Sequence, residues 1–233
     1  MNIKKKVIGF IPGYEFKDTE HLIDYPIPSR LSIPDWYKKL PLYRGKNKFD
    51  GANGANSTVK GCIPFLESLT LGYSLVVQQD LEVTRSSNGA IINWGGGIPI
   101  VKMREGHEYM PVPVGCDFEQ FSWNTVVGFE LPKGYSAIIT HPLNRYDLPF
   151  ISSSGVYDDG LNFNGTFSFW LKKDFEGIIP AGTPYAQIIP FKREPWKSEK
   201  RTDLIVDAEK IRVASLKRIG GYKKLIQKKK TFE

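Results

Sequence analysis

Short segments with β-strand character dominate the middle of the chain. Between Val59 and Phe191, apolar and β-branched runs alternate with Gly, Pro and Asn, and no amphipathic stretch reaches helical length. Short strands at this density are typical of an all-β barrel or sandwich. Asn88-Gly89 predicts a tight hairpin, because both residue types tolerate positive φ. The predicted strands are LTLGYSLVVQ, LEVTR, GAIINW, GIPIVKM, TVVGFEL, YSAIITH, GTFSFWLK, GIIPAG and YAQIIPF.

The two ends of the chain follow other patterns. The first 58 residues form an extended arm rich in aromatic residues and proline, in which Asp35 is expected to cap a short helix, and they end in a Gly/Asn-rich loop. We therefore divide the chain into this arm (1–58), a β body (59–196) and a C-terminal helical tail (197–233). The tail repeats weakly apolar positions every three or four residues, with an interruption at Gly220-Gly221. This stripe consists of Ala208, Ile211, Ser215, Ile219, Tyr222 and Ile226.

The net charge of +7 lies entirely in the tail. Residues 197–233 contain twelve basic and five acidic residues, so the remainder of the chain is neutral. A neutral body argues against a body that binds nucleic acid. We expect the tail helix to dock its apolar stripe on the body or on a neighbouring subunit, with its lysines in water. The alternative is that the basic tail binds phosphate groups, as in nucleic acid, or a membrane surface, through Lys223, Lys224, Lys228, Lys229 and Lys230.

Composition narrows the class of protein. With 41% hydrophobic and 24% charged residues, the chain can bury a core. No apolar run approaches the ~18–20 residues of a membrane-spanning helix, and the N-terminal MNIKKKVIGF is too short for a secretory signal. We therefore expect neither a membrane span nor secretion. The few cysteines and histidines lack metal-ligand spacing, so we predict no metal site, and Cys62 and Cys116 are interpreted as buried free thiols.

Four motifs between residues 69 and 191 occur in a characteristic order, and three of them lie in the second half of the chain. A strand begins at Tyr135 after LPKG, a Gly-Val-hydrophobic-Asp turn runs from Gly155 to Asp158, and a late strand carries Gly182 and Gln187. Together with LTLGYSLVVQQDLEV, they resemble the trimeric dUTPase and dCTP deaminase superfamily over about residues 70–191. The resemblance implies a mainly β protein with a β-clip, dUTPase-like barrel, which assembles as a homotrimer.

These motifs also supply the candidate site residues. An Asp just past a strand end could accept a proton from water, and a Gln could hydrogen-bond an oxyanion or a carbonyl, although Asp-Asp-Gly is also an ordinary turn. We expect the two motif glycines, Gly155 and Gly182, to adopt positive φ where strands turn. With the resemblance, Asp158 is the candidate catalytic residue. The candidate ligand-binding residues are Gln187, Arg145, Gly155 and Tyr135.

The chain departs from the superfamily at residues that its chemistry requires. Ser74 stands where active dUTPases carry a magnesium-holding Asp, and Thr183 replaces the Asp of the late strand. The phosphate-binding Arg-Ser-Gly is replaced by residues 141–144, with Arg145 displaced, and the Gly-rich C-terminal arm is missing. Magnesium-assisted cleavage needs anionic metal ligands and cationic phosphate clamps. We therefore expect no dUTPase turnover and no cofactor, with magnesium required only if the protein is an enzyme after all.

Most of the chain also resembles an uncharacterised family carried by tailed bacteriophages and some bacteria, through IPDWYKKLP, TVKGCIPFLESLTLGY, ITHPLNRYDLPFISSSGVYD and FEGIIPAGTPYAQIIPFKRE. This implies a phage protein in the host cytoplasm or in the virion. Our first hypothesis is a non-enzymatic oligomeric interaction protein or virion structural protein, with other phage or host proteins as partners. The alternative is a divergent nucleotide pyrophosphatase, deaminase or nucleotide-binding protein that acts through Asp158 and Gln187.

Overall fold

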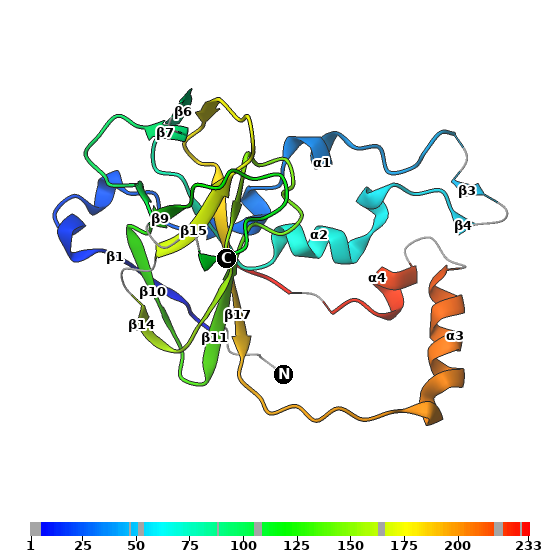
Figure 1. The fold of residues 1–233 in the computed structure, drawn as a ribbon. Helices are drawn as coiled ribbons and strands as arrows, with labels where there is room; N and C mark the ends of the chain where they lie inside the picture. Colours follow the sequence, from blue (N-terminus) through cyan, green and yellow to red (C-terminus); the bar gives the residue numbers. More distant parts are fainter. Residues whose placement is uncertain are drawn as a thin grey trace.

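The computed structural model describes residues 6–46, 48–50, 54–87, 89–104, 109–162, 166–216, 221–228 and 230–233. The fold is mainly β, as the sequence predicts, with short helices at one side (Figure 1). Within these residues the strands form several separate sheets, and none of the sheets closes on itself as a barrel. The expectation of a closed barrel is therefore not met.

A five-stranded antiparallel sheet carries most of the candidate site residues. Its strand order is β13-β11-β17-β5-β2. The register between β11 and β17 runs from Tyr135 opposite Lys192 to Thr140 opposite Gln187. On its other side, β11 pairs with β13, which places Gly155 opposite Ile139. The strands are β2 (Ile27–Pro28), β5 (Tyr73–Val76), β11 (Tyr135–Thr140), β13 (Gly155–Tyr157) and β17 (Pro184–Lys192).

The remaining strands form smaller antiparallel sheets around it. Their orders are β1-β10-β14, β12-β15-β9-β8, β16-β6-β7 and β3-β4. The first two sheets comprise β1 (Gly9–Pro12), β10 (Val127–Leu131), β14 (Gly160–Asn162), β12 (Phe150–Ser152), β15 (Thr166–Leu171), β9 (Phe121–Asn124) and β8 (Val101–Met103). The other two comprise β16 (Gly177–Ile179), β6 (Leu81–Ser86), β7 (Gly89–Asn93), β3 (Phe49–Asp50) and β4 (Gly54–Ala55).

Each predicted strand corresponds to an observed strand whose ends differ by a few residues, and the predicted hairpin is present. Strands β6 and β7 pair with Ser86 opposite Gly89, and Gly89 has a φ of +111°. Asn88 lies outside the described residues. Gly182 has the expected positive φ, whereas Gly155 does not, because it lies inside strand β13. Strands β1, β9, β12, β13 and β14 are absent from the prediction, because three or four residues show too little alternation to be recognised.

Two predictions about helices are wrong. The body does contain a helix, α2 (Ile63–Thr70), which has Pro64 in its first turn and is too short to show a helical period. In α1 (Asp35–Lys39), Asp35 lies in the first turn and does not cap the helix, because Pro34 occupies the capping position. Single 3-10 turns occur at η1 (Tyr14–Phe16), η2 (Glu20–Leu22), η3 (Ser29–Leu31), η4 (Val59–Gly61) and η6 (Thr202–Leu204).

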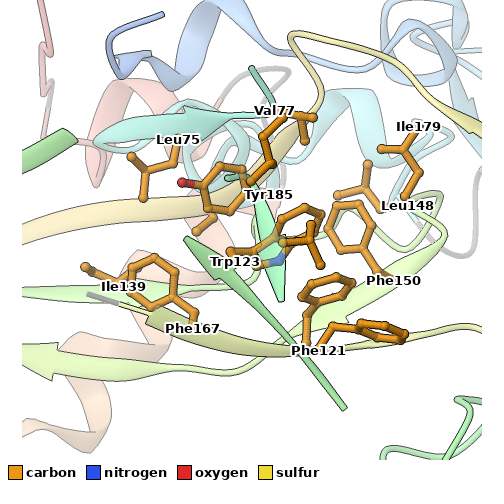
Figure 2. Packing of buried hydrophobic residues seen from close by; sticks show 14 of the residues in the cluster. Leu75, Val77, Phe121, Trp123, Ile139, Leu148, Phe150, Phe167, Ile179 and Tyr185 are labelled. Carbon is orange, nitrogen blue, oxygen red and sulfur yellow. The ribbon is translucent and has the colours of Figure 1, made fainter. Parts of the chain in front are cut away.

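The core is built around Trp123 of β9, which is completely buried. Its ring stacks on Phe169 at a centroid distance of 3.9 Å. It also stacks on Tyr185 at 4.8 Å, with Phe150 edge-on at 5.0 Å, and Figure 2 shows these two neighbours of Trp123. Strands β9, β12 and β15 of one sheet and β17 of the five-stranded sheet supply these rings, so this part of the core lies between the two sheets. Cys116 is buried as predicted, whereas Cys62 is exposed, because it lies at the N-terminus of α2.

The tail forms two helices and then returns to the body (Figure 1). These helices are α3 (Ile205–Leu216) and α4 (Gly221–Leu225). Ile211 of the predicted stripe is half exposed, so this part of the stripe is not buried on its own body. Beyond α4, Phe232 packs edge-on against Tyr73 at 5.9 Å, and the Tyr73 hydroxyl donates to the carbonyl of Glu233 at 3.1 Å. No described helix is both long and apolar enough to cross a membrane.

Candidate functional site

Asp158 lies directly after β13, at the end of the sheet where β11 begins. Its Oδ1 accepts a hydrogen bond from the Ser136 hydroxyl at 2.8 Å and lies 3.4 Å from the Arg193 guanidinium. The Asp158 side chain is 70% exposed. The structure thus places the predicted catalytic carboxylate on the surface, in contact with a hydroxyl and a cation.

The side chain of the neighbouring Asp159 is less exposed than that of Asp158 and contacts two groups of the protein. Its Oδ2 accepts from the Gly134 amide at 2.9 Å and from Arg193 at 2.8 Å. The Gly134 amide and then the Arg193 charge lower the pKa of Asp159. Arg193 also donates its backbone amide to the Gly134 carbonyl at 3.0 Å. Two carboxylates and one arginine therefore fasten the turn after β13 to the ends of β11 and β17, which is a structural use of the Asp-Asp-Gly turn.

Gln187 is buried, and its side-chain amide is fully engaged by the protein. Its Oε1 accepts from the Leu143 amide at 2.9 Å, and its Nε2 donates to the Ser68 carbonyl at 3.0 Å and to the Leu71 carbonyl. These contacts connect β17 to the loop after β11 and to the C-terminal end of α2. Such an amide holds three backbone segments together and has little capacity left for a ligand.

The structure does not bring Asp158 and Gln187 together within one chain. Asp158 contacts Ser136, whereas Gln187 lies opposite Thr140, four residues further along β11. Four residues of a strand span about 13 Å. Tyr135 lies at the Asp158 end of β11, where its ring contacts the Lys6 ammonium at 5.5 Å from the ring centroid. Gly155 lies toward the Gln187 end, so the predicted residues along β11 fall into two groups, one at each end of this strand.

Arg145 belongs to a third group, in the loop after β11. Its guanidinium makes a two-pronged contact with Asp147, at 2.9 Å for both Nε to Oδ1 and Nη2 to Oδ2, and also donates to the Ser32 carbonyl. The Trp36 indole donates to the same carboxylate at 3.2 Å. Burial raises the pKa of Asp147, but the Arg145 bonds outweigh it, so the pKa lies below its usual value. Arg145 is thus neutralised by Asp147, and Asp147 joins this loop to α1 through Trp36.

The ring of His141 links the same loop to β12 through two hydrogen bonds. The Ser152 amide donates to Nδ1 at 3.3 Å, so Nε2, 3.2 Å from the Arg145 carbonyl, carries the proton in the neutral ring. Burial, aided by the charges of Lys172 and Arg145, lowers the pKa of His141, while the Arg145 carbonyl and Asp147 oppose this effect. The ring is therefore a neutral structural link and not a phosphate clamp.

We expect the free energy of unfolding to decrease as the pH falls below about 6.5, the usual histidine pKa. Because the folded-state pKa of His141 lies lower, the unfolded chain binds the proton more readily and folding is disfavoured by up to about 1.4 kcal/mol per pH unit. Urea unfolding at pH 7.5, 6.5 and 5.5 measures this loss. His141→Gln should abolish most of the pH dependence, and His21→Gln, at an exposed position, should leave it unchanged. An equal slope in His141→Gln would contradict the assignment.

Ser74, at the position of the superfamily's magnesium-holding Asp, faces η3. Its hydroxyl lies 3.0 Å from both the Ser29 and the Ser32 hydroxyls and is buried. These contacts pin η3 of the N-terminal arm to the outer face of β5. In the part of the chain that the structure describes, no three His, Cys, Asp or Glu side chains cluster as metal ligands do.

The lysines of the basic tail fall into different environments. Lys223, Lys224 and Lys228 are exposed. Lys230 pairs with Glu67 of α2 at 3.0 Å, and Gln227 donates to the same carboxylate at 2.9 Å. These two bonds lower the pKa of Glu67. Lys229 lies outside the described residues. Part of the predicted basic patch therefore fastens the tail to the body.

Sequence reasoning missed an apolar row on the outer face of the five-stranded sheet. Ile138 of β11 lies opposite Val156 of β13 on one side and Ile189 of β17 on the other. Val156 is 67% exposed and Ile138 38%, and Phe191, two residues beyond Ile189, is 36% exposed. The adjacent isoleucines Ile138 and Ile139 contained the signal, because successive strand residues face opposite sides. We call Ile138, Val156, Ile189 and Phe191 the outer row.

No protein-family model matches the chain, and no curated protein matches it in sequence.

Proposed function

We propose that the protein is a non-enzymatic, oligomeric interaction module of a phage, in the virion or acting on host components, with a β-clip-like arrangement of its sheets. The observation that carries this proposal is the outer row: an apolar stripe across three strands, on a sheet whose opposite face lines the core. Surface valine, isoleucine and phenylalanine side chains that are contiguous across a sheet typically mark a protein contact.

The partner at the outer row is a second copy of this chain, and the assembly is a homotrimer. The stripe reaches β13, which is an edge strand of the five-stranded sheet, so an approaching copy meets both apolar side chains and a sheet edge. Asp158 and Arg193 flank the stripe with charges of opposite sign, which suits the polar rim of such an interface. The resemblance to the trimeric superfamily supports the same stoichiometry.

The polar residues support an interaction role over catalysis. An enzyme acting through Asp158 and Gln187 needs both side chains at one reacting group, with donors left over for the substrate. In the chain, the two lie about 13 Å apart along β11, and the Gln187 amide is engaged by backbone groups on both of its atoms. Their contacts hold the sheet and its loops together, which an interaction module requires.

We expect Val156→Lys to convert the trimer into monomers. Val156 is mostly exposed in the single chain, so lysine is compatible with the fold, but in the assembly it would place a charge in an apolar contact. Burying such a charge costs about 3 kcal/mol or more, which weakens association about 100-fold. Sedimentation at micromolar concentration should change from about 79 kDa, three times the chain mass of 26.4 kDa, to the monomer mass.

The matched control is Ile91→Lys, which introduces the same charge at a half-exposed residue of β7, outside the five-stranded sheet. It should remain trimeric. A wild-type protein that sediments only as a monomer would refute the trimer, and a trimeric Val156→Lys variant would show that the outer row is not its interface.

A further inference from the structure

A cleft of about 490 Å³ lies on the surface near the start of β17, apart from the outer row. Its walls come from the loop at residues 145–149, the turn at 172–175 and the segment at 178–184. Leu148 and Ile179 are almost completely buried at its floor, and Ile178 contributes a half-exposed apolar wall. The volume lies within the range of small-molecule sites, which are typically apolar clefts with a few polar groups.

The charged groups of the cleft leave a cation available at its rim. Arg145 is neutralised by Asp147, as described above, and Lys172 donates its ammonium to the Tyr146 carbonyl. Lys173 also lines the cleft and is exposed, and the described residues give its ammonium no ion pair. Asp174 offsets part of this charge, so the five ionisable groups carry a net charge of +1. An apolar floor beside an accessible lysine suits an amphipathic anion.

The backbone around the cleft is unusual as well. Among the described residues, only Asn144 and Asp174 adopt positive φ without being glycine, at 59° and 61°. Asp174 lines the cleft, and Asn144 directly precedes Arg145 in the opposite wall. Backbone strain of this kind is retained where the surrounding structure enforces it, and it concentrates at binding sites.

We propose that this cleft binds small organic anions in which a carboxylate, sulfonate or phosphate group is attached to a flat apolar group. The anionic group pairs with Lys173 at the rim, with Lys172 beside it, and the apolar group covers Leu148 and Ile179 against the wall formed by Ile178. This site is independent of the outer row and of Asp158, so it adds a ligand-binding function to the interaction role proposed above.

The test uses the full-length protein and two fluorescent compounds of similar shape. One is 8-anilinonaphthalene-1-sulfonate, which carries one negative charge, and the other is N-phenyl-1-naphthylamine, which carries none. We expect the sulfonate to bind saturably with one site per chain, and its affinity to fall when NaCl is raised from 50 to 500 mM. Lys173→Glu should weaken the sulfonate about tenfold and leave the neutral compound unchanged.

Two further variants test whether the compounds bind in the cleft and not elsewhere on the surface. Lys133→Glu reverses a charge at an exposed turn away from the cleft and should bind the sulfonate as the wild type does. Ile178→Ser should weaken both compounds, because it removes apolar surface from the wall. Unchanged sulfonate binding in Lys173→Glu, or equal losses in Lys173→Glu and Lys133→Glu, would overturn the proposal. Sedimentation of the same samples reports on trimerisation separately, so one proposal can fail without the other.

Discussion

Gln187→Leu is expected to lower the free energy of unfolding by about 3–5 kcal/mol. Leucine is similar in size but cannot replace the bonds of Gln187 to the Leu143 amide and the carbonyls of Ser68 and Leu71. Each buried polar group left without a partner costs about 1–3 kcal/mol. Urea unfolding followed by circular dichroism at pH 7.5 measures the change.

Gln120→Leu is the matched control for this substitution. Gln120 is as buried as Gln187, but the described residues give its side-chain oxygen no hydrogen-bond partner, and its side-chain nitrogen makes a weak 3.5 Å contact with the Met110 sulfur. Leucine removes that unpaired oxygen, so the variant should be as stable as the wild type or slightly more stable. If Gln187→Leu lost less than about 1 kcal/mol, the Gln187 amide would be dispensable for the fold, and a ligand-binding role for it would regain support.

Gly72→Ala is expected to destabilise the protein by about 3 kcal/mol or more. Gly72 precedes β5 with a φ of +69°, and an added Cβ would lie 1.9 Å from the carbonyl oxygen of Ile188 in β17. The left-handed conformation alone costs a non-glycine residue about 1–2 kcal/mol. The overlap with backbone adds to this cost, because β17 cannot move without disturbing its pairing with β11. Thermal and urea unfolding of the purified variant measure the loss.

Gly96→Ala is the control that separates the cost of the left-handed conformation from the cost of the overlap with backbone. Gly96 also has a positive φ, at +83°, but an added Cβ there meets no atom within 4 Å. We expect this variant to lose only about 1–2 kcal/mol, which is the conformational cost alone. Equal losses at the two glycines would show that the strand and the turn before β5 adapt freely, contrary to the close approach described here.

The strand content of the body was predictable from sequence, whereas its helix and sheet boundaries were not. LEVTR, GAIINW and YSAIITH have β-branched residues and turn signals that make β6, β7 and β11 recognisable. Helix α2 has only eight residues, so its apolar positions cannot be distinguished from those of a strand. The pairing of arm strands β1 and β2 with the body depends on contacts between distant segments, which no local pattern contains.

The arrangement of the candidate site residues also depends on contacts between distant segments. Three residues of the predicted turn at Gly155 to Asp158 form strand β13, and only Asp158 lies beyond it. The distance between Asp158 and Gln187 depends on how distant strands pair, which no local pattern contains. The roles of Gln187 and Ser74 were equally hidden, because their partners are backbone groups and hydroxyls of remote segments. The outer row was within reach, since two successive isoleucines in β11 cannot both face the core.

Tyr73 sets a constraint on how the chain folds as it leaves the ribosome. Its ring touches Phe10 of β1 at 5.3 Å and Phe232 near the other end of the chain at 5.9 Å, and its hydroxyl reaches Glu233 across 160 residues. The surroundings of Tyr73 therefore stay incomplete until translation has supplied the tail. Such long-range closure slows folding and prolongs the exposure of apolar strands, so the nascent chain should depend on chaperones more than its size suggests.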